Sequence, residues 1–211
     1  MSSKFLRDEQ GFTTITFTTQ ESQVLINLLE QLLELLGDSS VTGDHSDPWM
    51  NLFGSSGNDA PPDDPVLRRL LPNAYSDESD AAEFRRYTES GLREKKRSAA
   101  HIVYEALLPS ELQSDTEWNS DQPVDRSIFK VVIDSRDIQA WLTTLNDLRL
   151  ALAVRLGIGE RSVPDDSIEK SNQRFELMTD NDPMKAVYAV YSWLGWLQQS
   201  LLELLIDGDQ K

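Results

Sequence analysis

The 211-residue sequence contains no cysteine and only two histidines, His45 and His101. Without cysteine the chain cannot form a disulfide framework, a zinc–thiolate site or a thiol redox centre. No apolar run approaches the ~18 residues that a membrane span needs. The N-terminal residues also lack the apolar segment of a secretion signal. We therefore expect a cytoplasmic protein without a membrane segment.

Positive charge is scarce: 20 Lys and Arg residues stand against 36 Asp and Glu residues, for a formal net charge of −16. Phosphate backbones and anionic membranes attract positively charged proteins, so we expect neither as a direct ligand. Eight basic residues gather between positions 68 and 97. Pairing with acidic residues of the same chain explains them most simply, and a basic strip facing an acidic partner or DNA is the alternative. They are Arg68, Arg69, Arg85, Arg86, Arg93, Lys95, Lys96 and Arg97.

Sequence motifs for catalysis are missing as well. The chain has no glycine-rich phosphate loop, no nucleophile elbow and no metal-ligand spacing. His45 lies near Asp44 and Asp47, but acidic loop residues are usually only solvated, so a metal site is not the preferred interpretation. We therefore predict no catalytic residue, no cofactor and no metal ion, and we expect a protein that is not an enzyme.

The strongest pattern that is present is an amphipathic helix at residues 138–157. Its main apolar stripe is wide, and Leu150 and Val154 add apolar side chains on the opposite face. A helix that is apolar on two faces packs against neighbours on both sides, so we expect this helix at the centre of the core. The stripe consists of Ile138, Trp141, Leu142, Leu145, Leu148, Leu152 and Leu156.

Arg149 lies inside this stripe. A guanidinium among apolar side chains needs a partner, and we predict a structural ion pair with Glu83 or Asp80. The alternative is a clamp for the carboxylate or phosphate of a ligand, which would make the chain a small-molecule or anion sensor.

The remaining pattern predicts an α+β fold that is mainly helical, with about four principal helices and a small antiparallel sheet. The sheet is expected from an N-terminal hairpin at residues 5–17 and one later strand at residues 127–133. We treat residues 1–211 as a single regulatory domain. Residues 38–64, rich in Ser, Gly, Asp and Pro, are predicted to be a flexible acidic linker within it.

Local patterns place the ends of the helices. Thr18 and Glu21 form a capping-box pattern that predicts the start of the first helix, and Pro183 predicts the start of the last. A long helix is expected from Asp77 to about Leu108, preceded by a short ordered segment. Its apolar positions predict a buried stripe formed by Phe84, Tyr87, Thr88, Leu92, Ala99, Ile102 and Ala106.

Two groups of apolar residues are candidates for protein binding. The first is Trp49, Met50, Leu52 and Phe53, an apolar island in the linker. It either packs onto the core or folds on contact with a partner.

The second group is Trp193 and Trp196 on the last helix, which is apolar around most of its perimeter. Trp196 is either covered by another segment or anchors an interface. We predict a homodimer with Trp196 near the contact, because uncovered apolar patches usually mark interfaces. In the competing hypothesis the linker covers Trp196 and leaves a monomer.

Three segments carry a family resemblance: DPVLRRLLPNAY at 64–75, AAEFRRYTE at 81–89, and WLTTLNDLRL at 141–150 with RLG at 155–157. In this order and spacing they resemble the actinobacterial AosR-like family of oxidative-stress regulators, formerly a domain of unknown function. The resemblance covers nearly the whole chain.

The resemblance implies a cytoplasmic regulator of the oxidative-stress response that binds another protein, and it suggests a stress sigma factor as that partner. Thiol–disulfide sensing cannot carry over, because this chain has no cysteine. A direct DNA-binding transcription factor is the alternative function, and a small-molecule or anion sensor that uses Arg149 is the third.

Overall fold

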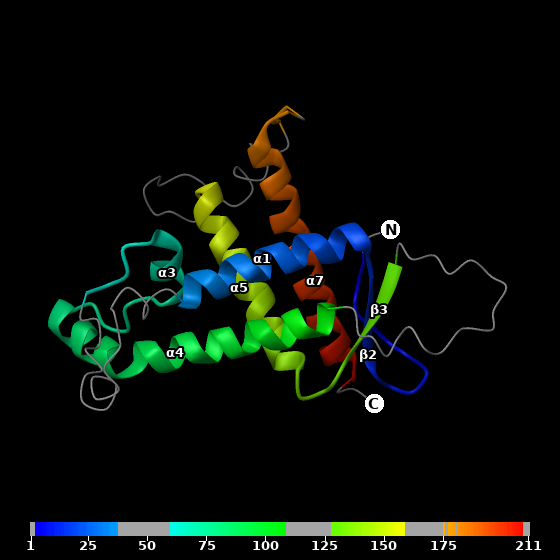
Figure 1. Ribbon diagram of the computed structural model, residues 1–211, viewed down its shortest axis with the longest axis horizontal. Helices are drawn as coiled ribbons and strands as arrows, with labels where there is room; N and C mark the ends of the chain where they lie inside the picture. Colours follow the sequence, from blue (N-terminus) through cyan, green and yellow to red (C-terminus); the bar gives the residue numbers. More distant parts are fainter. Residues whose placement is uncertain are drawn as a thin grey trace, which may run out of the picture.

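The computed structural model describes residues 3–37, 60–108, 128–158, 175, 177–179 and 181–208. The architecture of these residues is α+β and mainly helical, which confirms the predicted fold class (Figure 1). The helices are α1 (Thr19–Gly37), α3 (Pro65–Leu70), α4 (Glu78–Leu107), α5 (Ile138–Leu156) and α7 (Pro183–Gly208). The strands are β1 (Leu6–Arg7), β2 (Thr13–Thr18) and β3 (Ile128–Ile133).

The sheet of the described residues is antiparallel with the order β1-β2-β3. A tight turn joins β1 to β2: the Asp8 carboxylate accepts hydrogen bonds from the backbone N–H groups of Gln10 and Phe12, and Gly11 adopts a φ of 87°. A positive φ of this size is cheap only for glycine. Ile15 pairs with Val131 in the register of β2 and β3. The predicted hairpin and later strand are thus confirmed.

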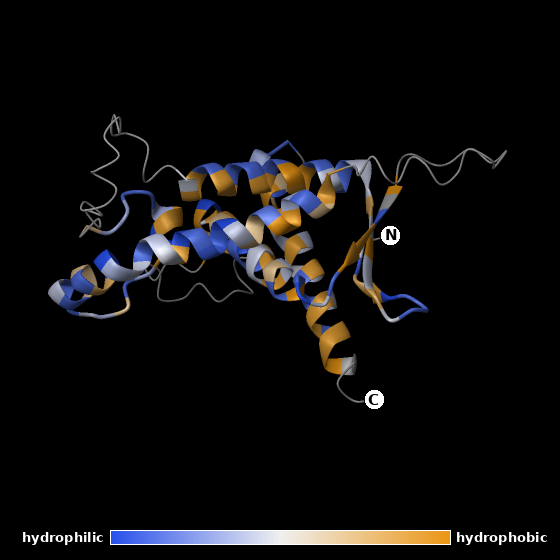
Figure 2. Cartoon of the chain, turned by 60° about the horizontal axis from the view of Figure 1, so that its bottom comes forward, coloured by the Kyte–Doolittle hydropathy of each residue, from blue (hydrophilic) through white to orange (hydrophobic). Residues whose placement is uncertain are grey.

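The two faces of the sheet differ in burial, because successive side chains of a strand point to opposite sides. Ile15, Phe17, Val131 and Ile133 are buried against the helices. Residues one position away in each strand point outward. Figure 2 shows the sheet at one end of the molecule, with the described helices on one side of it.

The start of α1 has the predicted capping box. The Thr18 hydroxyl accepts a hydrogen bond from the Glu21 N–H at 3.2 Å, and Glu21 Oε2 accepts one from the Thr18 N–H at 2.8 Å. Partial burial alone would raise the pKa of Glu21, but hydrogen bonds from Thr18 and Ser3 lower it below its usual value. The capping box therefore depends on an ionised carboxylate.

Helix α5 lies at the centre of the core, as predicted. It packs against α4, α7, α3 and α1, and Figure 1 shows it crossing α1 and α4. Trp141 is buried and meets the Phe5 ring edge to face, with centroids 5.7 Å apart. Leu145 and Leu152 are buried on the same stripe.

The predicted buried stripe of α4 is wrong along the whole helix. In the second half the buried residues are Ala100, Val103 and Leu107, each one position after a predicted residue that is only half-buried. In the first half Phe84, Tyr87 and Leu92 are exposed, whereas Arg85, Glu89 and Arg93 are buried. Both Nε and Nη2 of Arg93 donate to Glu89 Oε1, at 2.9 and 2.7 Å, and Arg85 donates to Asn73 and to Glu89. Mutual pairing makes the burial of these charges tolerable, so the polar residues turn inward and the apolar ones outward.

Candidate protein-binding surfaces

Arg149 lies half-buried between α5 and α7. Its Nη1 donates a hydrogen bond of 2.6 Å to Gln198 Oε1, and its guanidinium carbon lies 5.3 Å from the centroid of the Tyr191 ring. Gly195 leaves room for it, since a Cβ at that position would lie 3.4 Å from Arg149 Nε. A neutral amide and an aromatic face therefore hold the cation and tie α5 to α7.

The predicted ion pair of Arg149 with Glu83 or Asp80 is wrong. Both acids are exposed on the first half of α4, whereas Arg149 faces α7. Asp147 precedes Arg149 by two residues, and at 100° per residue the two side chains point to nearly opposite sides of α5. The side of Arg149 faces α7, and the side of Asp147 faces α4. Lys96 Nζ of α4 lies 2.7 Å from Asp147 Oδ1.

This Lys96–Asp147 ion pair is a second buried charge contact that sequence reasoning missed, after that of Arg85, Glu89 and Arg93. Asp147 is 1% exposed, and burial raises the pKa of its carboxyl group although Lys96 opposes the change. The sequence did carry an indication: Ala140, Thr144 and Ala151 surround Asp147 at helical spacing. A row of small residues is typical of a close contact between helices.

The basic residues of the 68–97 region largely serve the chain itself, as the simpler interpretation predicted. Arg85 and Arg93 bond to Glu89, and Lys96 bonds to Asp147. Arg97 bonds to Glu94. Arg68 donates to the backbone carbonyl oxygens at positions 62 and 63. These residues therefore offer little free positive charge to a phosphate backbone.

The outward side of the sheet forms an apolar and threonine-rich surface, which we call the outer sheet face. Val132 is 56% exposed, and Leu6 and Ile128 are each 50% exposed. Ser3, Lys4 and Leu6 line a hollow here together with residues 14–18 of β2, which include the buried Ile15 and Phe17, and with Ile128. The outer sheet face consists of Leu6, Thr16, Thr18, Ile128, Lys130 and Val132. Thr14 lies between Leu6 and Val132 in the register of the strands but is itself buried.

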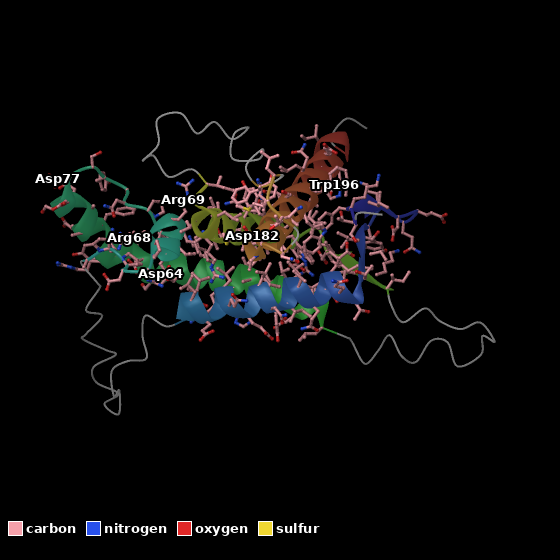
Figure 3. The ribbon with its side chains drawn as sticks, turned by 90° about the horizontal axis from the view of Figure 1, so that it is seen from above. Asp64, Arg68, Arg69, Asp77, Asp182 and Trp196 are labelled. Carbon is pink, nitrogen blue, oxygen red and sulfur yellow. The ribbon has the colours of Figure 1, made fainter. Side chains whose placement is uncertain are left out.

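Trp196 lies at the margin of the outer sheet face. Its Nε1–H donates a hydrogen bond of 3.0 Å to the backbone oxygen of Ser3, a residue that also lines the hollow. Figure 3 shows Trp196 on α7 close to the N-terminal segment. The ring stays 44% exposed, so it is only partly covered. Trp193 instead packs edge to face against Phe17 and is half-buried.

Several predicted residues lie outside the described part of the chain. These are Trp49, Met50, Leu52 and Phe53 of the apolar island, and His45. Among the helices that the structure describes, none is both long and apolar enough to cross a membrane.

Comparison with known proteins gives a family. The sequence profile described as "Domain of unknown function (DUF2017)" matches residues 2–205. Proteins described as "Oxidative stress regulator AosR" from Mycobacterium tuberculosis and Mycobacterium bovis are each 29% identical to this chain over 207 residues, covering 96% of this chain and 85% of the relative. A Mycobacterium leprae relative is 28% identical over 200 residues, covering 88% and 79%. No solved structure matches this chain.

Proposed function

The chain belongs to the family described as a domain of unknown function, DUF2017, and on this premise we propose that it is a non-enzymatic cytoplasmic regulator of the oxidative-stress response that acts by binding another protein. Two mycobacterial relatives that are aligned with 96% of the chain carry the name of oxidative stress regulator. A regulator without cysteine receives its signal through a partner or through its own abundance, not through a thiol of its own.

The observation that carries the proposal of protein binding is the outer sheet face. Its half-exposed Leu6, Ile128 and Val132 lie on one side of a sheet whose other side is packed into the core. Contiguous exposed apolar surface on a protein usually marks an interaction site. Trp196 at the margin adds a tryptophan, one of the residue types that contribute most to binding at interfaces.

Charge favours a protein partner over DNA. At a net charge of −16 the chain repels a phosphate backbone, and its clustered basic residues pair mainly with acids of the chain itself. A partner that itself binds DNA, such as a sigma factor, carries a basic surface, and that surface is complementary in charge to this acidic chain. A stress sigma factor is therefore the first partner to test, in line with the family resemblance.

The alternative of an anion sensor built on Arg149 is weaker. The Arg149 guanidinium already donates a hydrogen bond to Gln198 and lies over the Tyr191 ring. A ligand anion would have to displace both contacts. Direct DNA binding is the remaining alternative, and the dependence of binding on salt concentration separates it from protein binding.

The experiment is a calorimetric titration of the purified chain against the stress sigma factor of the same organism. We expect Val132→Lys, which puts a charge into the outer sheet face, to weaken binding by at least about tenfold, or 1.4 kcal/mol. Gln23→Lys is the matched control, because it adds the same charge at an exposed position of α1. An equal loss of affinity in Val132→Lys and Gln23→Lys would contradict the proposal that the outer sheet face binds the partner. Tight binding to DNA that weakens steeply with salt would contradict the function.

A further inference from the structure

The first half of α4 carries a second exposed apolar surface, at the opposite end of the molecule from the sheet (Figure 1). Tyr87 is 73% exposed, and the exposed rings of Phe84 and Tyr75 meet edge to face with centroids 5.6 Å apart. This surface, the α4 ridge, consists of Asp80, Phe84, Tyr87, Gly91 and Lys95, which are exposed, and of the half-buried Thr88. At 100° per residue these six positions fall on one side of the helix.

The buried charges of α4 fix the direction of the ridge. Arg85, Glu89 and Arg93 are bonded to one another and to Asn73 on the inward side. Turning Phe84 and Tyr87 inward would expel these paired groups and break their hydrogen bonds. The aromatic residues therefore stay on the surface of the fold, where only another molecule or another part of the chain can cover them.

Gly91 in the middle of the ridge has no packing reason among the described residues. A Cβ added there would meet nothing within 4 Å, and glycine inside a helix costs about 1 kcal/mol relative to alanine. A glycine on an exposed helix face allows a second helix to approach closely. Its position four residues after Tyr87 places this gap beside the most exposed aromatic ring of the ridge.

The ridge is complementary to itself. In an antiparallel pair of α4 helices with a two-fold axis between Tyr87 and Thr88, positions whose numbers sum to 175 face each other. Phe84 then lies opposite Gly91 of the second copy, so that an aromatic ring meets the position that has no side chain.

The charges match in the same register. Asp80 lies opposite Lys95, and neither has an ion-pair partner among the described residues. One two-fold axis thus aligns both the apolar and the charged positions, as an isologous interface requires.

We propose that the chain forms a homodimer through the α4 ridge, with Phe84 of each copy against Gly91 of the other and Asp80 paired with Lys95. This moves the contact from α7, where the sequence pattern predicted it, to α4. The net charge of −16 opposes association, but repulsion between exposed charges is screened beyond about 8 Å at physiological salt.

The dimer leaves both outer sheet faces open. The start of α4, marked by Asp77, lies at the end of the molecule far from the sheet (Figure 3). Two partner-binding surfaces would then point away from the two-fold axis. The proposal rests on α4 alone and stands or falls separately from the proposed partner at the sheet.

Sedimentation velocity across a range of protein concentrations tests the proposal through a charge exchange. Asp80→Lys and Lys95→Asp should each weaken dimerisation by about tenfold or more, because each places like charges opposite each other. The double variant should restore the wild-type dissociation constant, since the pair is re-formed with reversed polarity. If a single variant failed to dimerise because it did not fold, the second substitution would not restore the dissociation constant. Thermal unfolding of all three variants shows whether each of them is folded.

Two further variants separate the ridge from α7. Gly91→Leu should give a monomer, because the side chain fills the position that Phe84 of the other copy needs. Trp196→Ser should dimerise like the wild type. A wild-type protein that stays monomeric up to high concentration would overturn the proposal. The proposal would also be overturned if the double variant Asp80→Lys with Lys95→Asp did not restore the dimer, or if Trp196→Ser were monomeric.

Discussion

Lys96 of α4 and Asp147 of α5 form an ion pair of 2.7 Å in the interior, where the Asp147 residue is 1% exposed. Lys96 reaches this carboxylate from a partly exposed position. Burial raises the pKa of Asp147, and the neighbouring ammonium only partly opposes that change. The contact between α4 and α5 thus contains one acid whose charge depends on a single cation.

The first prediction removes that cation. Lys96→Met should lower the free energy of unfolding at neutral pH by about 3 kcal/mol, since it leaves a buried carboxylate unpaired. A raised pKa means that folded Asp147 binds a proton more readily than the unfolded chain does. Its contribution to stability therefore increases as the pH falls through the raised pKa. Urea unfolding at pH 7 and pH 5 should show the defect shrinking at the lower pH.

The control for this prediction is the double variant Lys96→Met with Asp147→Asn. It removes both charges and should recover most of the lost stability at neutral pH. A defect of the same size at both pH values, or one that the second substitution does not relieve, would show that Lys96 acts through packing alone.

The second prediction concerns Arg149. Arg149→Met should cost about 1 kcal/mol, because methionine refills the space between α5 and α7 while losing the contacts to Gln198 and Tyr191. Arg149→Ala should cost about 2 to 3 kcal/mol, because it adds a cavity. Denaturant unfolding measures the difference. Equal costs for the two variants would mean that the arm of Arg149 contributes no packing.

The third prediction concerns the capping box of α1. Thr18→Ala should lower the free energy of unfolding by about 1 kcal/mol at neutral pH. The pKa of Glu21 is lowered in the folded state, so its contribution is present above the unfolded pKa and is lost as the pH falls through the folded one. The difference in the free energy of unfolding between the wild type and Glu21→Gln, measured by urea unfolding, should therefore decrease as the pH is lowered. A difference that stays constant down to acid pH would contradict the assignment.

The fourth prediction concerns oxidation. Peroxide should produce no covalent cross-link in the purified chain, since it has no cysteine, and methionine sulfoxide is the accessible sulfur product. Non-reducing electrophoresis and mass spectrometry should show single chains with added oxygen. A change in size that a reductant reverses, and that persists after all four methionines are replaced, would contradict this prediction.

The sequence predicted the parts of the fold that local pattern controls. The stripe around Trp141 identified the central helix, and Thr18 with Glu21 identified the start of α1. Asp182 and Pro183 likewise mark the start of α7, where the Asp182 carboxylate accepts a hydrogen bond from the Met184 N–H. Each of these features depends on residues that lie close together in the chain.

Features that depend on how helices face one another could not be predicted in this way. Periodicity assigned Phe84 to the core, but the pairing of Arg85 and Glu89 with each other and with Asn73 buries the opposite side of α4. We expected a carboxylate of α4 as the partner of Arg149, but its partner is the side-chain amide of Gln198 on α7. The pattern of one helix does not say which neighbouring helix lies on which side.

The central claim is that the chain regulates by contact of its outer sheet face with another protein. A photo-reactive amino acid at position 132, introduced into the full chain in its own cells before and after peroxide stress, tests this claim most directly. We expect it to capture one defined protein, whereas the same group at position 23 of α1 captures none. Capture of DNA, or equal capture of proteins from both positions, would contradict the account.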